Sequence, residues 1–220
     1  MTTDADLAIN ATGLADVPEI GEVLQAAGFT HGTNPGHWIA DSDVAVDLMV
    51  VPHQAGTTKA SARAARLPPH DRRTARIARG LEPALLDNQR VTIAALEASD
   101  TREFDLRVAG PAALLTAKAI KIAERLVQAD QQPDRLKEKD ALDMFRLLQA
   151  VETPDLVGGF KAHSADAYAA AVTNEALDLL RTEGTTQRGR IPILASSAAY
   201  GDLTIAPAFA ALAGQLLAAL

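Results

Sequence analysis

The sequence predicts an α+β fold in which a small mixed or antiparallel sheet is followed by a helical C-terminal half. Residues before position 110 contain β-rich segments separated by turn-type clusters, whereas apolar residues after Pro111 recur at helical spacing. Strands early and helices late are typical of the α+β class. The 220 residues, 48% hydrophobic and 22% charged, suffice for one good domain or two small ones. We therefore expect an α+β domain over 1–110 and a helical domain over 111–220.

The N-terminal half is expected to contain short strands, loops and two helices. The expected strands are 5–10, 37–40, 44–51, 90–96 and 103–109. Asp41-Ser42-Asp43 predicts a turn between the second and third strands, and Ala98-Ser99-Asp100-Thr101 predicts one between the last two. The expected helices are Asp16–Phe29, capped by its first residue, and Asp71–Leu86, which follows a loop or partly helical connector over 54–70.

Helical patterns dominate after residue 110. The expected helices are 111–127, about 134–150, about 164–181 and about 206–220, with a loop at 184–189. In the first of these helices, apolar residues that recur every three or four positions predict a buried stripe: Leu115, Ala119, Ile122 and Leu126.

Composition and charge narrow the range of functions. The formal net charge of -7 argues against a protein that coats nucleic acid nonspecifically, because phosphate binding draws on clustered Lys and Arg. The absence of cysteine excludes disulfides, thiolate zinc sites and cysteine nucleophiles, so carboxylates or histidines must hold any metal, which favours magnesium. No apolar run approaches the roughly 20 residues of a membrane span, and the acidic N-terminus is unlike a signal peptide. We therefore expect a cytoplasmic protein with no membrane partner.

One segment carries a strong excess of positive charge. Between positions 59 and 79 a single acid, Asp71, opposes a set of basic residues: Lys59, Arg63, Arg66, Arg72, Arg73, Arg76 and Arg79. The simpler interpretation is a solvated connector, and the functional one is a surface that binds RNA or a protein partner. Within the expected helix from Asp71, three of the arginines, at 72, 76 and 79, would share one face.

Two aspartates near the N-terminus are candidates for metal binding. Asp4 and Asp6 are two residues apart in an expected strand, so their side chains should project from the same face. Like charges so close together are stable when water screens them, when they share a proton, or when a cation lies between the oxygens. From these two residues alone, a solvated acidic tail is the simpler interpretation.

Asp47 strengthens the functional interpretation. It interrupts the apolar run of residues 44–51, whose continuity predicts a strand covered on both faces. Burying an unpaired carboxylate costs several kcal/mol, so Asp47 should be paired, as in a salt bridge with an arginine, or protonated, or bound to a metal. If its strand lies beside that of Asp4 and Asp6, the three carboxylates form a magnesium site. Nucleotidyl transfer uses such a scaffold to hold two magnesium ions roughly 4 Å apart.

Charged residues also cluster on the first two expected helices of the C-terminal half. Lys118 and Arg125 are two turns apart at the edge of the buried stripe, as in a clamp for a triphosphate, although an amphipathic helix edge has the same pattern. In the next helix Lys139 and Asp143 form an i,i+4 pair, and Asp140 lies on the same face as Asp143. On physical grounds these acids are surface charges or partners for Lys118 and Arg125.

Taken in order, these pieces resemble the nucleotidyltransferases of the AbiEii/AbiGii toxin type, in the DNA polymerase beta-like superfamily. The resemblance covers roughly residues 3 to 150 and is carried by four motifs: Thr3-Asp4-Ala5-Asp6-Leu7, Val46-Asp47-Leu48-Met49-Val50, Pro111-x-Ala113-Leu114-Leu115-x-x-Lys118-x6-Arg125 and Lys139-Asp140-x-x-Asp143. None is specific alone, but their order and spacing are those of the family.

The resemblance implies a magnesium-dependent enzyme that transfers a nucleotide from a nucleoside triphosphate to an RNA or protein acceptor. It implies that Asp4, Asp6 and Asp47 bind metal and that Asp140 or Asp143 completes the catalytic site. It further assigns the phosphates to three cationic side chains, Lys118, Arg125 and Lys139. Such proteins are often toxins paired with an antitoxin, and some modify transfer RNA.

The sequence departs from the family pattern at one point. Members carry a helix with a Gly-Gly or Gly-Ser motif before the Asp-x-Asp strand, and here only Met1-Thr2-Thr3 precede Asp4. Gly158-Gly159 is far downstream and is expected to be a helix-ending turn. We therefore expect either an upstream start codon or a truncated relative. In the second case the chain is an inactive module that binds RNA or protein through residues 59–79.

Overall fold

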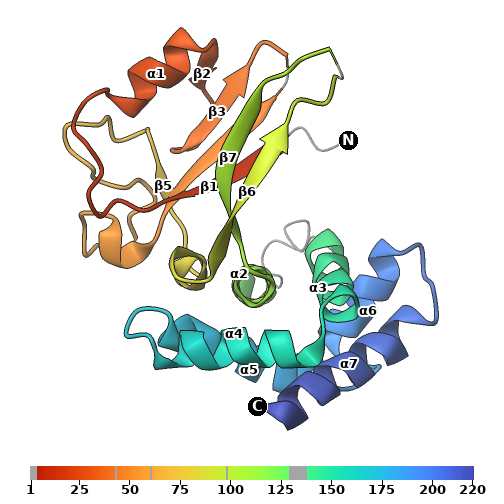
Figure 1. Ribbon diagram of the computed structural model, residues 1–220. Helices are drawn as coiled ribbons and strands as arrows, with labels where there is room; N and C mark the ends of the chain where they lie inside the picture. Colours follow the sequence, from red (N-terminus) through yellow and green to blue (C-terminus); the bar gives the residue numbers. More distant parts are fainter. Residues whose placement is uncertain (1–3, 43, 60, 98, 129–137) are drawn as a thin grey trace. The chain divides into compact units, whose positions relative to one another are not determined.

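The computed structural model describes residues 4–42, 44–59, 61–97, 99–128 and 138–220 (Figure 1). Within these residues a small mixed sheet is followed by a helical C-terminal half, so the predicted fold class is confirmed. The chain divides into two compact units, Met1–Leu81 and Glu82–Leu220. The hairpin expected in the first domain thus belongs to the second unit. Each unit is described by itself.

The first unit is built on a mixed sheet. Its strands are β1 (Asp4–Ile9), β2 (Phe29–His31), β3 (His37–Ala40), β4 (Ala45–Val50) and β5 (Arg76–Ile77). Their order is β1-β4-β3-β2, and β5 also pairs with β4. Strand β4 runs parallel to β1 and β5 and antiparallel to β3. The parallel pairing of β1 with β4 is the arrangement that the carboxylate interpretation requires.

The two faces of this sheet differ in character. Helix α1 (Ile20–Ala26) packs on the face formed by Trp38, Leu48 and Val50, which are all buried. The opposite face carries the alternate residues of β1 and β4, including the three aspartates. Burial of the first face holds the sheet together, while the second face combines the aspartates with two buried apolar residues of β4, Ala45 and Met49.

Two predicted helices of this region differ from the structure. The helix expected at Asp16–Phe29 begins only at Ile20, where the Glu19 carboxylate accepts a hydrogen bond from the Glu22 amide, and Phe29 already lies in β2. The helix expected at Asp71–Leu86 is wrong: this segment contains strand β5 and a 3-10 turn, Glu82–Leu85. Pairing of β5 with β4 outweighs the helical propensity of the arginine-rich sequence. A second 3-10 turn, Pro52–Gln54, starts the expected loop.

The second unit combines a hairpin with a helical bundle. Strands β6 (Asn88–Ala94) and β7 (Glu103–Ala109) form the predicted hairpin, whose turn includes a residue, Ala98, outside the described part. The helices are α2 (Pro111–Gln128), α3 (Glu138–Ala150), α4 (Thr153–Ala165), α5 (Ala170–Glu183), α6 (Arg190–Ala198) and α7 (Ile205–Ala219). Their common core includes the predicted stripe of α2, in which Leu115, Ala119 and Ile122 are buried and Leu126 is partly buried.

Several helix boundaries in this unit correct the expectations. The start expected near Asp134 lies outside the described residues, and α3 is described from Glu138. The helix expected over about 164–181 corresponds to α5, which begins only at Ala170, and helices α4 and α6 were not predicted. Gly158-Gly159, expected to end a helix, lies inside α4. Among the described residues, no helix is long and apolar enough to cross a membrane.

Candidate functional site

The aspartates of β1 and β4 lie side by side on one sheet face. In the parallel pairing of these strands Asp6 is directly opposite Asp47. Two residues earlier on each strand, Asp4 is opposite Ala45. Residues in register across paired strands point to the same face, and so do residues two apart along a strand. The structure therefore places on one sheet face, within the first unit, the three side chains that the sequence predicts as metal ligands. Asp4 and Asp6 are exposed, while Asp47 is half-buried.

Asp47 has a partner on each of its carboxylate oxygens. The imidazole Nδ1 of His37 lies 2.7 Å from Oδ1, since His37 is opposite Asp47 across the β3–β4 pair. The guanidinium Nη2 of Arg76 lies 3.4 Å from Oδ2, because Arg76 on β5 is opposite Met49, two residues beyond Asp47. The arginine salt bridge that was the structural alternative is thus present. His37 and Arg76 come from other strands, so no local pattern around Asp47 indicates them.

The chemistry of this face suits a hard divalent cation. Three carboxylates offer oxygen ligands, which are the donors that magnesium prefers, and two of them are exposed to solvent from which an ion would enter. Among the residues that the structure describes, no three His, Cys, Asp or Glu side chains are grouped to hold a metal ion. Magnesium binding by Asp4, Asp6 and Asp47 therefore stays a prediction.

A second charged cluster joins α2 to α3 inside the second unit. Lys118 Nζ lies 3.1 Å from an Asp140 oxygen and 2.9 Å from an Asp143 oxygen, and Arg125 also pairs with Asp140. Lys121 reaches Asp140 at 3.4 Å, and Arg146 reaches Asp143 at 3.2 Å. The interpretation that these acids are partners for Lys118 and Arg125 is confirmed. Their role toward a triphosphate stays a prediction.

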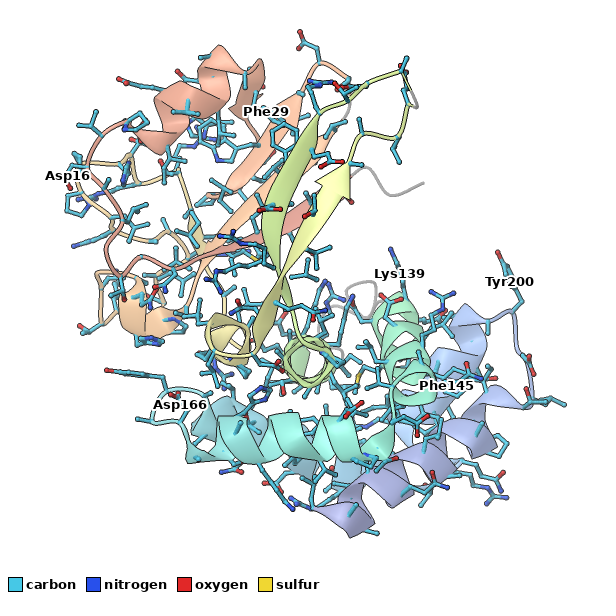
Figure 2. The ribbon with its side chains drawn as sticks, viewed as in Figure 1. Asp16, Phe29, Lys139, Phe145, Asp166 and Tyr200 are labelled. Carbon is cyan, nitrogen blue, oxygen red and sulfur yellow. The ribbon has the colours of Figure 1, made fainter. Side chains whose placement is uncertain are left out.

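Burial and charge act in opposite directions within this cluster. Asp140 is 4% exposed, and burial alone would raise its pKa, but Lys121, Lys118 and Arg125 outweigh burial and hold the pKa below its usual value. Burial would lower the pKa of Lys118, whereas its two aspartate partners raise it. Both groups therefore stay charged near neutral pH. The predicted pair of Lys139 with Asp143 is not among the ion pairs of the described residues, and Figure 2 shows Lys139 near the start of α3.

In its described residues, the positive segment of the first unit is mainly loop, with strand β5 at Arg76–Ile77, and forms no helix. Five of its arginines are exposed: Arg63, Arg66, Arg72, Arg73 and Arg79. The expected common helical face of Arg72, Arg76 and Arg79 does not exist, because no helix forms here. Arg76 points instead to Asp47, and Arg73 donates to the carbonyl oxygen of Gly32 at 2.6 Å. The loop thus shares one arginine with the aspartate face.

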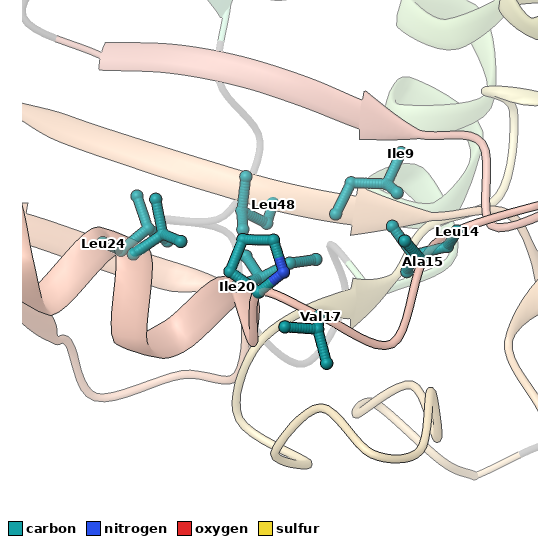
Figure 3. Close-up of a pocket in the computed structure, with 9 residues that line it drawn as sticks. Ile9, Leu14, Ala15, Val17, Ile20, Leu24 and Leu48 are labelled. Carbon is teal, nitrogen blue, oxygen red and sulfur yellow. The ribbon is translucent and has the colours of Figure 1, made fainter.

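An apolar pocket of about 380 Å³ lies on the other side of the same sheet (Figure 3). Ile9 and Leu48 from the strands face Ile20 and Leu24 from α1 across it. Asp6 and Asp47 project from the opposite face of β1 and β4, so this pocket does not include the carboxylates. Its lining offers no group for phosphate or metal chemistry.

The predicted site residues fall into two groups that belong to different units. Asp4, Asp6 and Asp47 lie in the first unit, and the α2–α3 cluster lies in the second. Comparisons with protein families, with curated proteins and with solved structures give no match. The functional argument therefore depends on the residues and their geometry.

Proposed function

We propose that this chain is a magnesium-dependent nucleotidyltransferase that moves a nucleotide from a nucleoside triphosphate to an RNA or protein acceptor. The observation that carries the proposal is the direct register of Asp6 with Asp47 on one sheet face, with Asp4 beside them. Three acids on one face repel each other unless a cation or a counter-ion compensates them. A role in holding divalent cations accounts for this placement.

In this proposal each side chain has a distinct task. Asp4, Asp6 and Asp47 hold the cations, and His37 fixes the orientation of the Asp47 carboxylate through its hydrogen bond. Magnesium held by these carboxylates would activate the acceptor hydroxyl and stabilise the departing pyrophosphate. The resemblance assigns Lys118, Arg125 and Lys139 to phosphate oxygens, and inside the second unit Asp140 and Asp143 pair with Lys118 and hold its ammonium group in place.

The acceptor and biological role follow from the resemblance alone. A transfer RNA or another RNA is the expected acceptor, and a cognate antitoxin is the expected protein partner. The exposed arginines of the 59–79 loop support an anionic acceptor, because they supply a local positive surface on an otherwise acidic chain.

An Asp47→Asn substitution tests the proposal. Asparagine keeps the shape of the side chain but removes its charge, so the protein should stay folded and lose at least about 100-fold in transfer rate, as when an essential electrostatic group is removed. The assay follows transfer of α-phosphate label from each of the four nucleoside triphosphates to total RNA and to protein. The matched control is Asp16→Asn, which removes an exposed acid from a loop of the same unit.

A second candidate function is a non-catalytic module that binds RNA or protein through the 59–79 loop. The exposure of Arg63, Arg66 and Arg72 is the observation that favours it. It predicts that charge reversal at these three arginines abolishes partner binding, whereas Asp4 and Asp6 substitutions have no effect. A wild-type protein that neither binds nor transfers any nucleoside triphosphate would select this second function.

A further inference from the structure

Strand β7 is an open edge of the β6–β7 hairpin. The hairpin consists of two strands, and among the residues that the structure describes β7 pairs with β6 alone (Figure 1). A two-stranded hairpin is marginally stable in water, and a strand with one unpaired side is a template for a further strand. The free side of β7 is therefore a candidate interaction surface.

The hydrogen-bond pattern shows which backbone groups lie on this free side. At the two ends of the hairpin, the Gly110 amide donates to the Asp87 carbonyl at 2.8 Å, and the Ala95 amide donates to the Arg102 carbonyl at 3.0 Å. In an antiparallel ladder every second residue bonds to the partner strand, so the even-numbered residues of β7 bond to β6. The remaining four residues direct their amides and carbonyls outward: Glu103, Asp105, Arg107 and Ala109.

The apolar residues of β7 lie on one face of the strand and are exposed. Phe104 is 63% exposed, Leu106 44% and Val108 38%. Alternation along the strand places these three side chains on the same face. Large apolar side chains that gather on an exposed edge strand indicate a surface that a partner covers.

Asp105 and Arg107 carry opposite charges on the other face. The side chain of Asp105 is 46% exposed, although it accepts a hydrogen bond from Thr92 at 2.7 Å and lies 3.5 Å from Arg90. Arg107 donates to the side-chain oxygen of Asn88 at 3.0 Å and forms no ion pair among the described residues. Both charged groups are therefore available to a partner at the free edge.

The backbone and the charges of β7 define one register with a second copy of the strand. In an antiparallel pair of β7 strands, the outward backbone groups meet only when odd-numbered residues oppose odd-numbered residues. A two-fold axis at Leu106 satisfies this condition, overlaps the strand over its full length, 103–109, and places Asp105 opposite Arg107 of the second copy. An axis at Asp105 or at Arg107 would place like charges opposite each other, which is destabilising.

The same register matches the apolar face. Phe104 lies opposite Val108 of the second copy, and Leu106 lies opposite its own equivalent at the axis. These pairs exchange no backbone hydrogen bonds across the edge, so their side chains approach each other most closely. Strand β6 offers no such match, because its outward residues include cations but no acids: Asn88, Arg90, Thr92 and Ala94.

We propose that the free edge of β7 pairs antiparallel with β7 of a second copy of this chain, so that two hairpins form one four-stranded sheet in a two-fold symmetric dimer. The occupant is the chain itself, because the charged and apolar side chains of β7 complement their own two-fold image. The inference goes beyond the proposed nucleotide transfer and does not depend on it.

Complementary charge reversals test the pairing. Asp105→Arg makes the edge cationic and Arg107→Asp makes it anionic, so each variant alone should dimerise about ten-fold or more weakly than wild type. An equimolar mixture of the two variants should dimerise like wild type, because every cross-strand pair is again opposite in charge. Sedimentation equilibrium of the full chain over a range of concentrations measures the association. Arg188→Asp, which reverses an exposed cation of the same unit, is the matched control and should leave it unchanged.

Amide hydrogen exchange identifies the edge that pairs. The amides of Asp105 and Arg107 point outward, so their protection should increase with protein concentration as the dimer forms. The amide of Leu106 bonds to β6 and should be protected at every concentration. Circular dichroism checks that each variant stays folded, and the mixture separates a lost contact from a damaged hairpin.

Three results would overturn the inference. The first is a chain that stays monomeric at every concentration. The second is a dimer in which the mixture of variants does not recover the association, which would mean that another surface pairs. The third is protection of the outward amides in the monomer, which would mean that the edge is covered within its own chain. None of these results bears on the proposed function, which the Asp47→Asn assay tests.

Discussion

Burial and neighbouring charges oppose each other at two buried titratable residues of the second unit, Asp140 and His163. The charges determine the direction of the pKa shift of Asp140, and burial determines that of His163. The carboxylate of Asp140 has three cationic neighbours, and its pKa falls although burial would raise it. His163 is fully buried on α4, and burial lowers its pKa against the opposing effect of Asp87, whose Oδ2 lies 3.1 Å from Nε2, and of Asp166. Asp140 therefore stabilises the fold in its charged form and His163 in its neutral form.

The lowered pKa of His163 predicts a pH-dependent stability. In the unfolded chain a histidine gains its proton near pH 6.5, above the pKa of the folded protein, so the unfolded state binds more protons as the pH falls. The free energy of unfolding should therefore decrease below about pH 7, with a slope of at most about 1.4 kcal/mol per pH unit from this residue. Urea unfolding followed by circular dichroism at several pH values measures it.

The His163→Gln protein isolates this contribution. Glutamine can still donate a hydrogen bond to Asp87 but does not titrate in this range. The difference in unfolding free energy between wild type and variant should shrink as the pH falls from 7.5 to 5.5. A difference that is constant across this range would show that His163 has the same pKa in both states.

Single residues show what the sequence could and could not predict about the site. The shared face of Asp4, Asp6 and Asp47 was predictable, because alternation along strands and an acid inside an apolar run are local signals. An arginine partner for Asp47 was one of the predicted alternatives, but its identity as Arg76 was not predictable, and neither was the contact with His37, because strand pairing across the sheet brings both residues to Asp47. For Asp140 and Asp143 the sequence left two alternatives, surface charges or partners for Lys118 and Arg125, and the structure shows the second.

Helix α4 approaches helix α2 closely at Gly159. An added Cβ at Gly159 would lie 2.6 Å from the Cβ of Ala112 on α2, whereas at Gly158 it would meet nothing within 4 Å. These adjacent glycines of one helix therefore provide a matched pair. One faces the neighbouring helix and the other faces open space.

Opposite effects of alanine at these two positions are the expected result. Gly159→Ala should destabilise the second unit by about 1–3 kcal/mol, because helices α2 and α4 must move apart to accept the methyl group. Gly158→Ala should stabilise it by up to about 1 kcal/mol through helix propensity. Urea unfolding monitored at 222 nm gives both values. Equal effects of the two substitutions would mean that α4 does not pack on α2 through Gly159.

Elements with strong internal periodicity were predicted well, and those defined by distant contacts were not. Helix α2 follows its apolar stripe almost to the predicted ends, and the β6–β7 hairpin follows its alternating pattern. The segment from Asp71 was predicted as helix from residue propensity, but its backbone pairs with β4 and with Arg63. Such pairing involves residues far away in sequence, so propensity alone does not indicate it.

At the scale of the whole molecule, the chain combines a sheet unit that carries the aspartates with a helical unit that carries the α2–α3 ion-pair cluster. The sequence placed the β6–β7 hairpin with the first of these, whereas the compact units divide at Leu81–Glu82. The sequence of a hairpin does not indicate which of two neighbouring units the hairpin packs with. The order of sheet first and helices later was predictable, because the apolar residues recur every two positions in strands and about every 3.6 positions in helices.

Localisation of Mn2+ by nuclear magnetic resonance tests the central claim, a cation site on the aspartate face, most directly. At substoichiometric Mn2+, the account predicts that the amide signals of Asp6 and Asp47 broaden first and that Asp47→Asn removes this selectivity. The exposed Asp178, which pairs only with Arg181 among the ion pairs of the described residues, is the internal reference for nonspecific binding. Broadening at Asp178 at the same Mn2+ concentration as at Asp6 and Asp47 would contradict the claim.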